Sequence, residues 1–323
     1  MPGRDEILQQ VAETLLGARS VAICAHVDPD GDAMGSTLGL THLLRDCGVA
    51  VVPLLASGDH APATYAFLPG ASELQAASSA PAVDVFVALD APDPVRLGGG
   101  EERAREAHTL IVIDHHPDNK RFGDINLVDE HAAATGELLW ELLPYLDCSA
   151  DTTTASCLFT AIMTDTGRFS YGNTSPAALR HAAEMIEAGA NVSDLYRRVY
   201  ENRSPGALAL VARTLDRLTF ANGGQIAYSW IDEADFAETG ALPEETENLI
   251  DEIRVVSGVE TVALLKASSD SVRVSLRAKN GYDVGLVART LGGGGHAAAA
   301  GFTRAGSLDA VLGELLPLLS SVS

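Results

Sequence analysis

Short apolar runs alternate with helical patterns along the first half of the chain. Four mainly apolar runs have the length of a β-strand, at residues 20–25, 49–56, 84–89 and 109–113. Such runs are typical of parallel strands buried on both faces, and the segments between them are long enough for crossover helices. One helical pattern ends near Cys47, where Gly48 is placed to stop it. The first half therefore predicts an α/β domain with a doubly wound, mostly parallel sheet, whose ligand sites lie beyond the carboxyl ends of the strands.

The second half of the chain mixes hairpin and helix signals. Residues 175–200 have helical spacing, and the polar, breaker-rich stretch 201–206 follows them. The later elements expected are a hairpin over 217–231 with a glycine turn, helices over 242–256, 284–291 and 307–319, and strands over 261–267 and 271–278. This mixture predicts a smaller α+β domain. We expect a first domain over 1–190, a linker over 191–206 and a second domain over 207–323.

The net charge limits the partners that this protein can have. The 323 residues include 22 Lys and Arg against 44 Asp and Glu, which gives a formal charge of −22. Sequence-independent binding of long nucleic acid needs many basic groups, so a long polyanion is disfavoured. A short or small anionic substrate held in one local site is allowed. No stretch approaches the roughly 20 apolar residues that span a bilayer, and no membrane partner is expected.

The amino terminus and the cysteines indicate a reducing compartment. Residues 1–11 contain no apolar core of a secretory signal, so a cytoplasmic location is expected. The four cysteines, Cys24, Cys47, Cys148 and Cys157, form no CxxC pair. We expect buried thiols rather than a disulfide framework.

Aspartate and histidine side chains follow three of the predicted strands. The segment 26–32 contains one imidazole and three carboxylates, Asp90 follows the third apolar run, and 114–116 follows the fourth. Each segment alone is an ordinary polar turn. Three strand ends of this kind, on the face where such sheets bind ligands, point instead to a site, and Asp165 follows a further helical pattern. The candidate metal ligands are His26, Asp30, Asp32, Asp90, His115 and Asp165.

Carboxylates outnumber imidazoles in this set, and that ratio indicates the type of metal. Oxygen-rich sites favour Mn²⁺ or Mg²⁺, with Co²⁺ as an alternative, and the absence of cysteine ligands argues against structural zinc. Six ligands exceed the need of one catalytic ion. We therefore expect two divalent cations, Mn²⁺ before the others, bridged by a shared carboxylate.

Two other polar residues carry weaker signals. Ser36 lies in the first turns of a predicted helix, where it would either contact a bound phosphate or cap the helix. His181 has no partner pattern and is expected to be structural or solvated.

The order of these motifs resembles that of the DHH phosphoesterase superfamily. The matching segments are HxDPDGD at 26–32, Asp90, Asp-His-His at 114–116, and Thr-Asp-Thr-Gly at 164–167. The glycine tract and histidine at 292–296, with 299–301, resemble the DHHA1 substrate-binding domain of that family. The resemblance implies one ion on His26, Asp30 and Asp90, and a second on Asp32, Asp90, His115 and Asp165. It also implies that His116 faces the scissile phosphate and that Asp114 orients the imidazoles from behind.

The glycine tract is interpreted as a phosphate contact rather than a linker. It lies between a predicted helix and the small residues 297–300, and small side chains let backbone N–H groups approach a phosphate. The resemblance implies that Gly294, Gly295 and His296 contact the terminal phosphate of the substrate. Ser275, Arg277 and Lys279 alternate along the preceding strand and share one face, and the resemblance favours phosphate contacts there, above all for Arg277.

The compact two-domain form resembles the nanoRNase branch of the family. That resemblance implies hydrolysis of short oligoribonucleotides, including linear pApA, to mononucleotides, and of 3′-phosphoadenosine 5′-phosphate to AMP and phosphate. Two ions would activate a bridging hydroxide, and the substrate would lie between the domains. A homodimer formed through the first domain is also implied.

The sequence also allows comparison with four other functions. A cyclic-dinucleotide phosphodiesterase of the same family stays open. The glycine tract disfavours a manganese pyrophosphatase, and the length disfavours a RecJ-like exonuclease. A complete ligand set disfavours an inactive nucleotide sensor.

Overall fold

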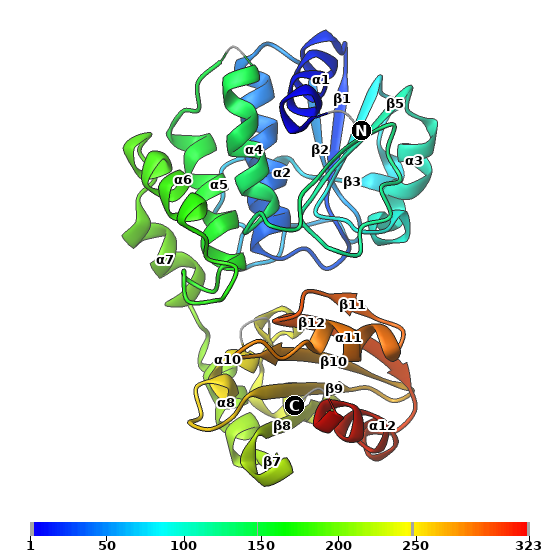
Figure 1. The fold of residues 1–323 in the computed structure, drawn as a ribbon, viewed down its shortest axis with the longest axis vertical. Coiled ribbons are helices and arrows are strands. Elements are labelled where there is room, and N and C mark those ends of the chain that lie inside the picture. Colours follow the sequence, from blue (N-terminus) through cyan, green and yellow to red (C-terminus); the bar gives the residue numbers. More distant parts are fainter. Residues whose placement is uncertain (1–2, 147, 247–248, 322–323) are drawn as a thin grey trace. The chain divides into compact units, whose positions relative to one another are not determined.

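The chain forms two compact units (Figure 1). The computed structural model describes residues 3–146, 148–246 and 249–321. The first unit ends at Glu201 and the second begins at Asn202. Helix α7 (Val192–Tyr200), inside the expected linker, belongs to the first unit. Over the described ranges, no helix combines the length and the apolar content needed to cross a membrane.

The first unit contains a six-stranded sheet in the order β3-β2-β1-β4-β5-β6. Its strands are β1 (Val21–Cys24), β2 (Val51–Leu55), β3 (Gln75–Ala76), β4 (Val85–Leu89), β5 (Thr109–Asp114) and β6 (Ile125–Val128). Every neighbouring pair is parallel, which confirms the predicted sheet. The apolar pattern missed β3 and β6, because both are short and neither is a continuous apolar run.

Helices cover both faces of this sheet. Strand side chains alternate between two cores: Ile23 and Val87 pack on one face, and Cys24 and Phe86 on the other. The core on the first face contains side chains of α1 (Arg4–Gly17), α2 (Gly31–Asp46), α4 (Thr135–Leu142), α5 (Thr152–Asp165), α6 (Pro176–Glu187) and α7, of which α1, α2 and α4 contact the strands. The second face is covered by α3 (Glu101–Glu106) and by the 3₁₀ helices 77–79 and 94–100. Burial on both faces explains why the strands are apolar throughout.

Helices α2 and α5 approach each other closely because glycines lie between them. A Cβ atom on Gly35 would lie 2.4 Å from the carbonyl oxygen of Cys157, and one on Gly31 would lie 2.4 Å from Oγ1 of Thr164. This close packing brings the beginning of α2 to the end of α5. The acidic residues at those two helix ends are thereby held near each other.

The prediction that all four cysteines are thiols was wrong for two of them. Cys47, at the end of α2, and Cys148, shortly before α5, form a disulfide, whereas Cys24 and Cys157 are buried free thiols. The bonded residues are 101 positions apart. No local spacing reveals such a pair, because only the packing of α2 against α5 brings the two residues together.

Two helix boundaries also differ from the pattern. The helical stretch 175–200 is two helices, α6 and α7, separated near Gly189, whose φ of 110° is unsuited to a helix. The sequence pattern shows where α2 ends but a polar loop up to Ala33 hides its beginning. The helix begins at Gly31, because the Asp30 side chain caps it by accepting hydrogen bonds from the N–H groups of Asp32 and Ala33.

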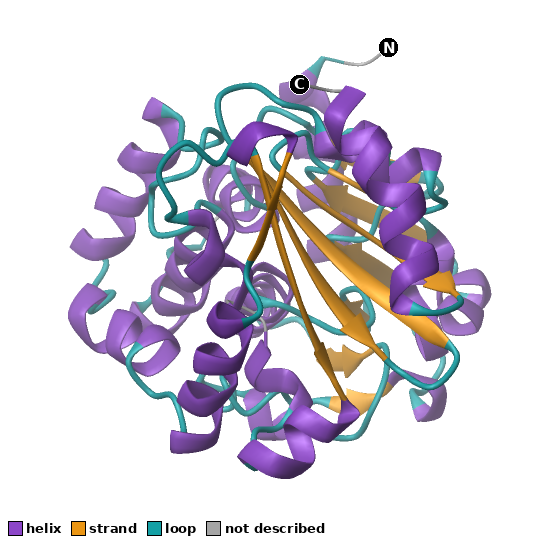
Figure 2. Ribbon diagram, turned by 90° about the horizontal axis from the view of Figure 1, so that it is seen from below, coloured by secondary structure: helices purple, strands orange, loops and turns teal. Residues whose placement is uncertain are grey.

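The second unit contains a mixed sheet in the order β11-β12-β10-β9-β8-β7. Its strands are β7 (Thr219–Ala221), β8 (Ile226–Asp232), β9 (Thr261–Ala267), β10 (Ser271–Ala278), β11 (Gly294–Gly295) and β12 (Ala299–Ala305). The predicted hairpin and the strands over 261–267 and 271–278 are confirmed, and the strands fan out with a visible twist (Figure 2). Among the described strand pairs of this second sheet, only β8–β9 is parallel.

Helices flank this second sheet as well. One core holds α8 (Pro205–Asp216) and α10 (Leu249–Arg254), with α9 (Glu233–Thr239) beside them, and the other holds α11 (Val284–Thr290) and α12 (Leu308–Ser321). The helix expected over 242–256 is a 3₁₀ turn at 243–246 followed by α10. Residues 247–248 of that expectation lie outside the described residues.

Candidate metal centre

Polar side chains gather at the carboxyl ends of three adjacent strands of the first sheet. His26 follows β1, Asp90 follows β4, and Asp114 ends β5. The chain winds outward from β1 in both directions, so the gap between β1 and β4 is the point where strand order reverses, which is where such sheets bind ligands.

A first ligand group lies at the end of β1. The Nε2 atom of His26 is 3.4 Å from Oδ2 of Asp90 and 3.8 Å from Oδ1 of Asp30. The Nδ1 atom of His26 lies 2.7 Å from the carbonyl oxygen of Val27, to which it can donate its proton. That hydrogen bond leaves the lone pair of Nε2 directed at the two carboxylates.

A second ligand group lies around His115. Its Nε2 atom is 3.5 Å from Oδ1 of Asp90, 3.7 Å from Oδ2 of Asp32 and 3.6 Å from Oδ2 of Asp165. The Nδ1 atom again faces a backbone carbonyl, that of Ala132, at 3.2 Å. Asp90 is therefore common to both groups, with one oxygen toward each histidine.

These distances fit ions placed between the side chains. Separations of 3.4 to 3.8 Å are too long for good hydrogen bonds. Two donor atoms that each lie about 2.1 Å from one cation are about 3 to 4 Å apart. The six predicted ligands are brought together in two groups, and their oxygen-rich composition fits Mn²⁺ or Mg²⁺.

Helix α4 fixes the carboxylate of Asp32. The backbone N–H groups of Thr135 and Gly136 donate to Oδ2 and Oδ1 of Asp32, at 2.6 and 3.0 Å. Ser36 donates to Oδ1 at 2.8 Å and is fully buried. Ser36 is thus neither a cap nor exposed to a phosphate: it holds Asp32. The role of the start of α4 was missed, because about 100 residues separate it from Asp32 and no local motif marks it.

Asp114 orients both histidines that follow it. Its Oδ1 atom accepts from Nδ1 of His116 at 2.8 Å and from the backbone N–H of His115 at 2.9 Å. Its Oδ2 atom accepts from Nδ2 of Asn119 at 2.5 Å. Asn119 was missed by the sequence analysis, although its place three residues after His116 in the same loop is a local signal. The carboxylate is fully buried and serves as a fixed support for the imidazole of His116.

Asp165 is held at the end of α5 by an asparagine. Nδ2 of Asn173 donates to the carbonyl oxygen of Asp165 at 3.1 Å and lies 3.4 Å from its Oδ2 atom. The same Nδ2 donates to the carbonyl oxygen of Ala133 at 3.0 Å. Asn173 therefore joins the Asp165 loop to the segment before α4.

The charges of this cluster are strongly unbalanced. Burial raises the pKa of Asp165 to about 6, against the pull of His115, and burial together with Asp90 raises the pKa of Asp32 well above its usual value. Burial also disfavours the ionised form of Asp90, but His115 and His26 hold its pKa well below the usual range. Divalent cations are the chemical means of neutralising so many buried carboxylates.

In the second unit, β12 lies between the glycine tract of β11 and β10, which carries Ser275 and Arg277. Gly301 of β12 pairs with Ser275 on one side and with Gly294 on the other, and Ala299 pairs with Arg277. A Cβ atom on Gly295 would lie 2.7 Å from the carbonyl oxygen of Ala299. The tract is therefore a close-packed hairpin strand, and a flexible linker is excluded.

The basic side chains of this strand differ in their surroundings. The Nε atom of Arg277 is buried and has no hydrogen-bond partner among the described residues, and its Nη1 donates to the carbonyl oxygen of Leu276. Lys279 lies just beyond β10, and its Nζ donates to the carbonyl oxygen of Val256 at 3.2 Å. His296 closes the turn between β11 and β12, where its backbone N–H donates to Ala299.

Comparison with known proteins identifies both units. The N-terminal domain of the DHH family matches residues 20–163, and the DHHA1 domain matches residues 223–320. The bifunctional oligoribonuclease and PAP phosphatase NrnA of Thermus thermophilus is 34% identical over 303 residues, which cover 93% of this chain and 89% of that protein.

Solved structures agree on the fold. An exopolyphosphatase-related protein from Bacteroides fragilis superposes with a TM-score of 0.87 at 22% identity, over 98% of this chain and 96% of that one. RecJ of Thermus thermophilus, solved in complex with Mn²⁺, gives a TM-score of 0.51 at 15% identity, over 98% of this chain and 54% of its own.

Proposed function

The chain belongs to the DHH family and carries the DHHA1 domain, and from this premise we propose that it hydrolyses short oligoribonucleotides to mononucleotides and 3′-phosphoadenosine 5′-phosphate to AMP and phosphate. The name of the Thermus thermophilus relative supports this pair of activities. The observation that carries the proposal is the position of Asp90 between two groups of ligands. Two-metal sites of this kind are suited to in-line displacement at phosphorus.

The proposed ligands fall into two groups, one for each divalent cation. His26, Asp30 and Asp90 would hold one divalent cation, and Asp32, Asp90, His115 and Asp165 would hold the other. Mn²⁺ is the preferred ion, which the RecJ complex supports. When bound, such a pair lowers the pKa of a water molecule and offsets charge on the phosphate.

His116 is the proposed proton donor to the phosphate oxygens. Burial lowers its pKa, but the Asp114 carboxylate raises it above its usual value, which favours the protonated ring. Nδ1 faces Asp114 at 2.8 Å, and Nε2, on the opposite side of the ring, is the proposed donor to the substrate. A fixed, charged donor stabilises the negative charge that develops in the transition state.

The second unit is proposed to bind the terminal phosphate. Arg277 supports this role best, because its buried Nε atom lacks a partner in the described structure. Ser275 and Gly294 lie on either side of Gly301, and Gly295 and His296 continue the same hairpin. We include Lys279 as well, although its bond to Val256 gives it less freedom than Arg277.

A hydrolysis panel tests the proposed substrates. The full chain with Mn²⁺ would be given 3′-phosphoadenosine 5′-phosphate, linear and cyclic di-adenylate, and pyrophosphate. We expect the highest kcat/KM values on 3′-phosphoadenosine 5′-phosphate and linear di-adenylate. Preference for cyclic di-adenylate would move the chain to another branch of the family, and preference for pyrophosphate would contradict the proposal.

A further inference from the structure

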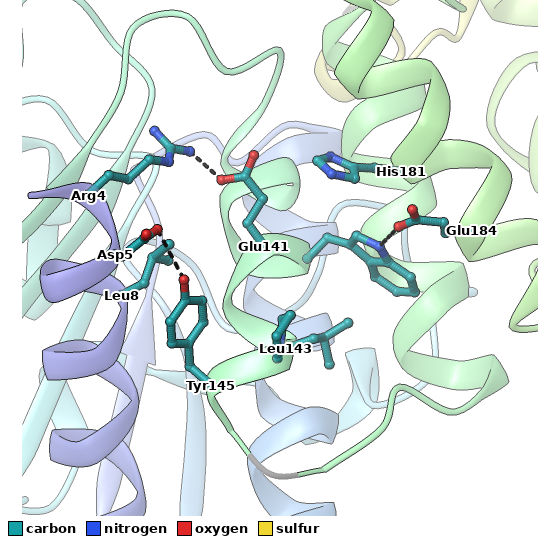
Figure 3. A pocket seen from close by; sticks show the side chains of 10 residues that line it. Arg4, Asp5, Leu8, Glu141, Leu143, Tyr145, His181 and Glu184 are labelled. Atoms are coloured by element: carbon teal, nitrogen blue, oxygen red, sulfur yellow. Dashed lines mark hydrogen bonds and ion pairs between the residues drawn. The ribbon is translucent and has the colours of Figure 1, made fainter.

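A second set of metal-ligating side chains lies on the first unit, apart from the proposed catalytic ligands. Glu137 and Glu141 are one turn apart on α4, and His181 comes from α6. One ligand atom from each lies within 4.8 Å of the other two. Glu141 and His181 line a cavity of about 420 Å³ together with Arg4 and Trp140, and Figure 3 shows Glu141 between Arg4 and His181.

Two buried ligand atoms of this set lie side by side. Nδ1 of His181 is buried and lies 3.2 Å from Oε1 of Glu137, with which it forms an ion pair whose geometry is poor for a hydrogen bond. The side chain of Glu137 is only 3% exposed, and its Oε2 accepts from the N–H of Ala133 at 2.6 Å. Two ligand atoms at this separation can both coordinate one metal ion placed between them.

The other polar groups of the cavity already have partners. Trp140 donates its Nε1 proton to Glu184 at 2.7 Å, and the hydroxyl of Tyr145 donates to Asp5 at 3.2 Å (Figure 3). Arg4 pairs with Glu141 and with Asp129. The carboxylates of Asp5, Glu137, Glu141 and Glu184 still outnumber the guanidinium of Arg4, and such an excess of negative charge favours a cation.

We propose that Glu137, Glu141 and His181 bind a third divalent cation, for which Zn²⁺ is a suitable probe. Imidazole nitrogen and carboxylate oxygen are both ligands of Zn²⁺, and water from the cavity would complete the shell. Glu141 is 26% exposed and can turn toward the ion while Arg4 keeps Asp129. The site joins α4 to α6, so the ion would act as a clamp between them.

The position of Glu137 gives this ion a link to the catalytic groups. Glu137 holds the N–H of Ala133, and the adjacent carbonyl of Ala132 faces Nδ1 of His115. The first two residues of α4, Thr135 and Gly136, donate backbone hydrogen bonds to the carboxylate of Asp32. An ion on Glu137 would therefore stiffen the same turn that positions two catalytic ligands.

Zinc stoichiometry of the full chain tests the proposal. The protein is stripped with a chelator, equilibrated with low micromolar Zn²⁺ in excess Mg²⁺, and analysed for bound zinc by mass spectrometry. We expect His181→Ala and Glu141→Gln each to bind one zinc per chain fewer than the wild type. Glu184→Gln is the matched control, because Glu184 lines the same cavity but is not a proposed ligand, and it should bind as much zinc as the wild type.

A second measurement separates an ion site from a structural cluster. Zn²⁺ should raise the melting temperature of the wild type and of Glu184→Gln by the same amount, and the increase should be smaller in His181→Ala. Equal zinc content in the wild type and both ligand variants would overturn the proposal. If His181→Ala does not fold, Glu141→Gln decides, because the Glu141 side chain is partly exposed and its substitution disturbs the core less.

Discussion

At the scale of single residues, the backbone of Asp90 explains how one carboxylate can reach two ligand groups. Its φ of 53° lies in the left-handed region, which aspartate and asparagine enter more readily than other residues with a side chain. Its N–H donates to the carbonyl oxygen of Ile113 at 3.0 Å, and Oγ1 of Thr135 donates to its Oδ1 at 3.2 Å. The turn directs one oxygen toward His26 and the other toward His115.

The Asp90→Asn variant tests the shared carboxylate. Asparagine tolerates the same backbone conformation, so the circular dichroism spectrum should not change, but it removes the charge common to both groups. We expect kcat with Mn²⁺ on 3′-phosphoadenosine 5′-phosphate to fall by at least about 100-fold.

The matched control for this variant is Asp93→Asn. Asp93 lies in the same loop, but its partners are Lys120 and the N–H of Val95. Its substitution should leave kcat within about twofold of the wild type. An Asp90→Asn variant that keeps more than about a tenth of wild-type activity would contradict the two-metal assignment.

At the scale of elements, a buried carboxylate holds α8, α9 and β8 together in the second unit. Asp235 of α9 is 1% exposed and accepts from Arg213 at 3.1 Å and from Nη2 of Arg217 at 2.8 Å. It also accepts from the N–H of Asp232 at 2.9 Å. Burial disfavours the ionised carboxylate, but Arg217, the N–H of Asp232 and Arg213 lower its pKa.

The Asp235→Asn variant should destabilise the second unit by about 2 kcal/mol, because two guanidinium groups lose their common partner. Denaturation by urea at pH 7, followed by tryptophan fluorescence, measures this loss. Trp230 reports on the second unit, since Arg217 lies over its ring. Glu238→Gln is the control: Glu238 is an exposed partner of Arg213, and its loss should cost less than about 0.5 kcal/mol.

The pH dependence of stability in the wild type and in Asp235→Asn tests the same interaction. Because the pKa of Asp235 is lowered on folding, its contribution is complete above the unfolded pKa of about 3.9 and is lost as the pH falls through the folded value. The difference in unfolding free energy between wild type and Asp235→Asn should therefore shrink below about pH 4. A difference that stays constant down to pH 2.5 would show that the ion pair is not its source.

At the scale of the whole molecule, the net charge bears on substrate length. The formal charge is −22, and two divalent cations would reduce it only to −18. Long RNA gains affinity when many Lys and Arg side chains bind its phosphates and displace counterions into solution. This chain has 22 Lys and Arg residues in total. The positive groups proposed to bind substrate are few and local, which suits a short chain.

Competition by long RNA tests this inference. A 40-residue RNA added to a linear di-adenylate assay should leave the rate within about twofold, even in several-fold excess over the substrate. A five-residue RNA should compete, because it lies within the length range of the proposed substrates. Strong inhibition by the long RNA, relieved by salt, would contradict the length preference.

Local sequence patterns were enough to predict the parallel sheet, which the structure confirms, and to name the six proposed ligands. Apolar runs that are buried on both faces have one simple architecture, and the residues after β1, β4 and β5 are neighbours in it because the carboxyl ends of parallel strands share one edge. For the same reason the six ligands could be named from local motifs, although their division between ions needed the family resemblance.

The residues that hold the proposed ligands in place could be identified only from the folded structure. The start of α4 binds Asp32, Asn173 binds Asp165, and Cys47 bonds to Cys148, and each pair is joined by packing rather than by sequence spacing. The same is true of the set formed by Glu137, Glu141 and His181, in which two helices supply the side chains. A hydrogen bond or a metal ligand depends on distances of a few ångströms, and those distances are set only when helices pack against the sheet.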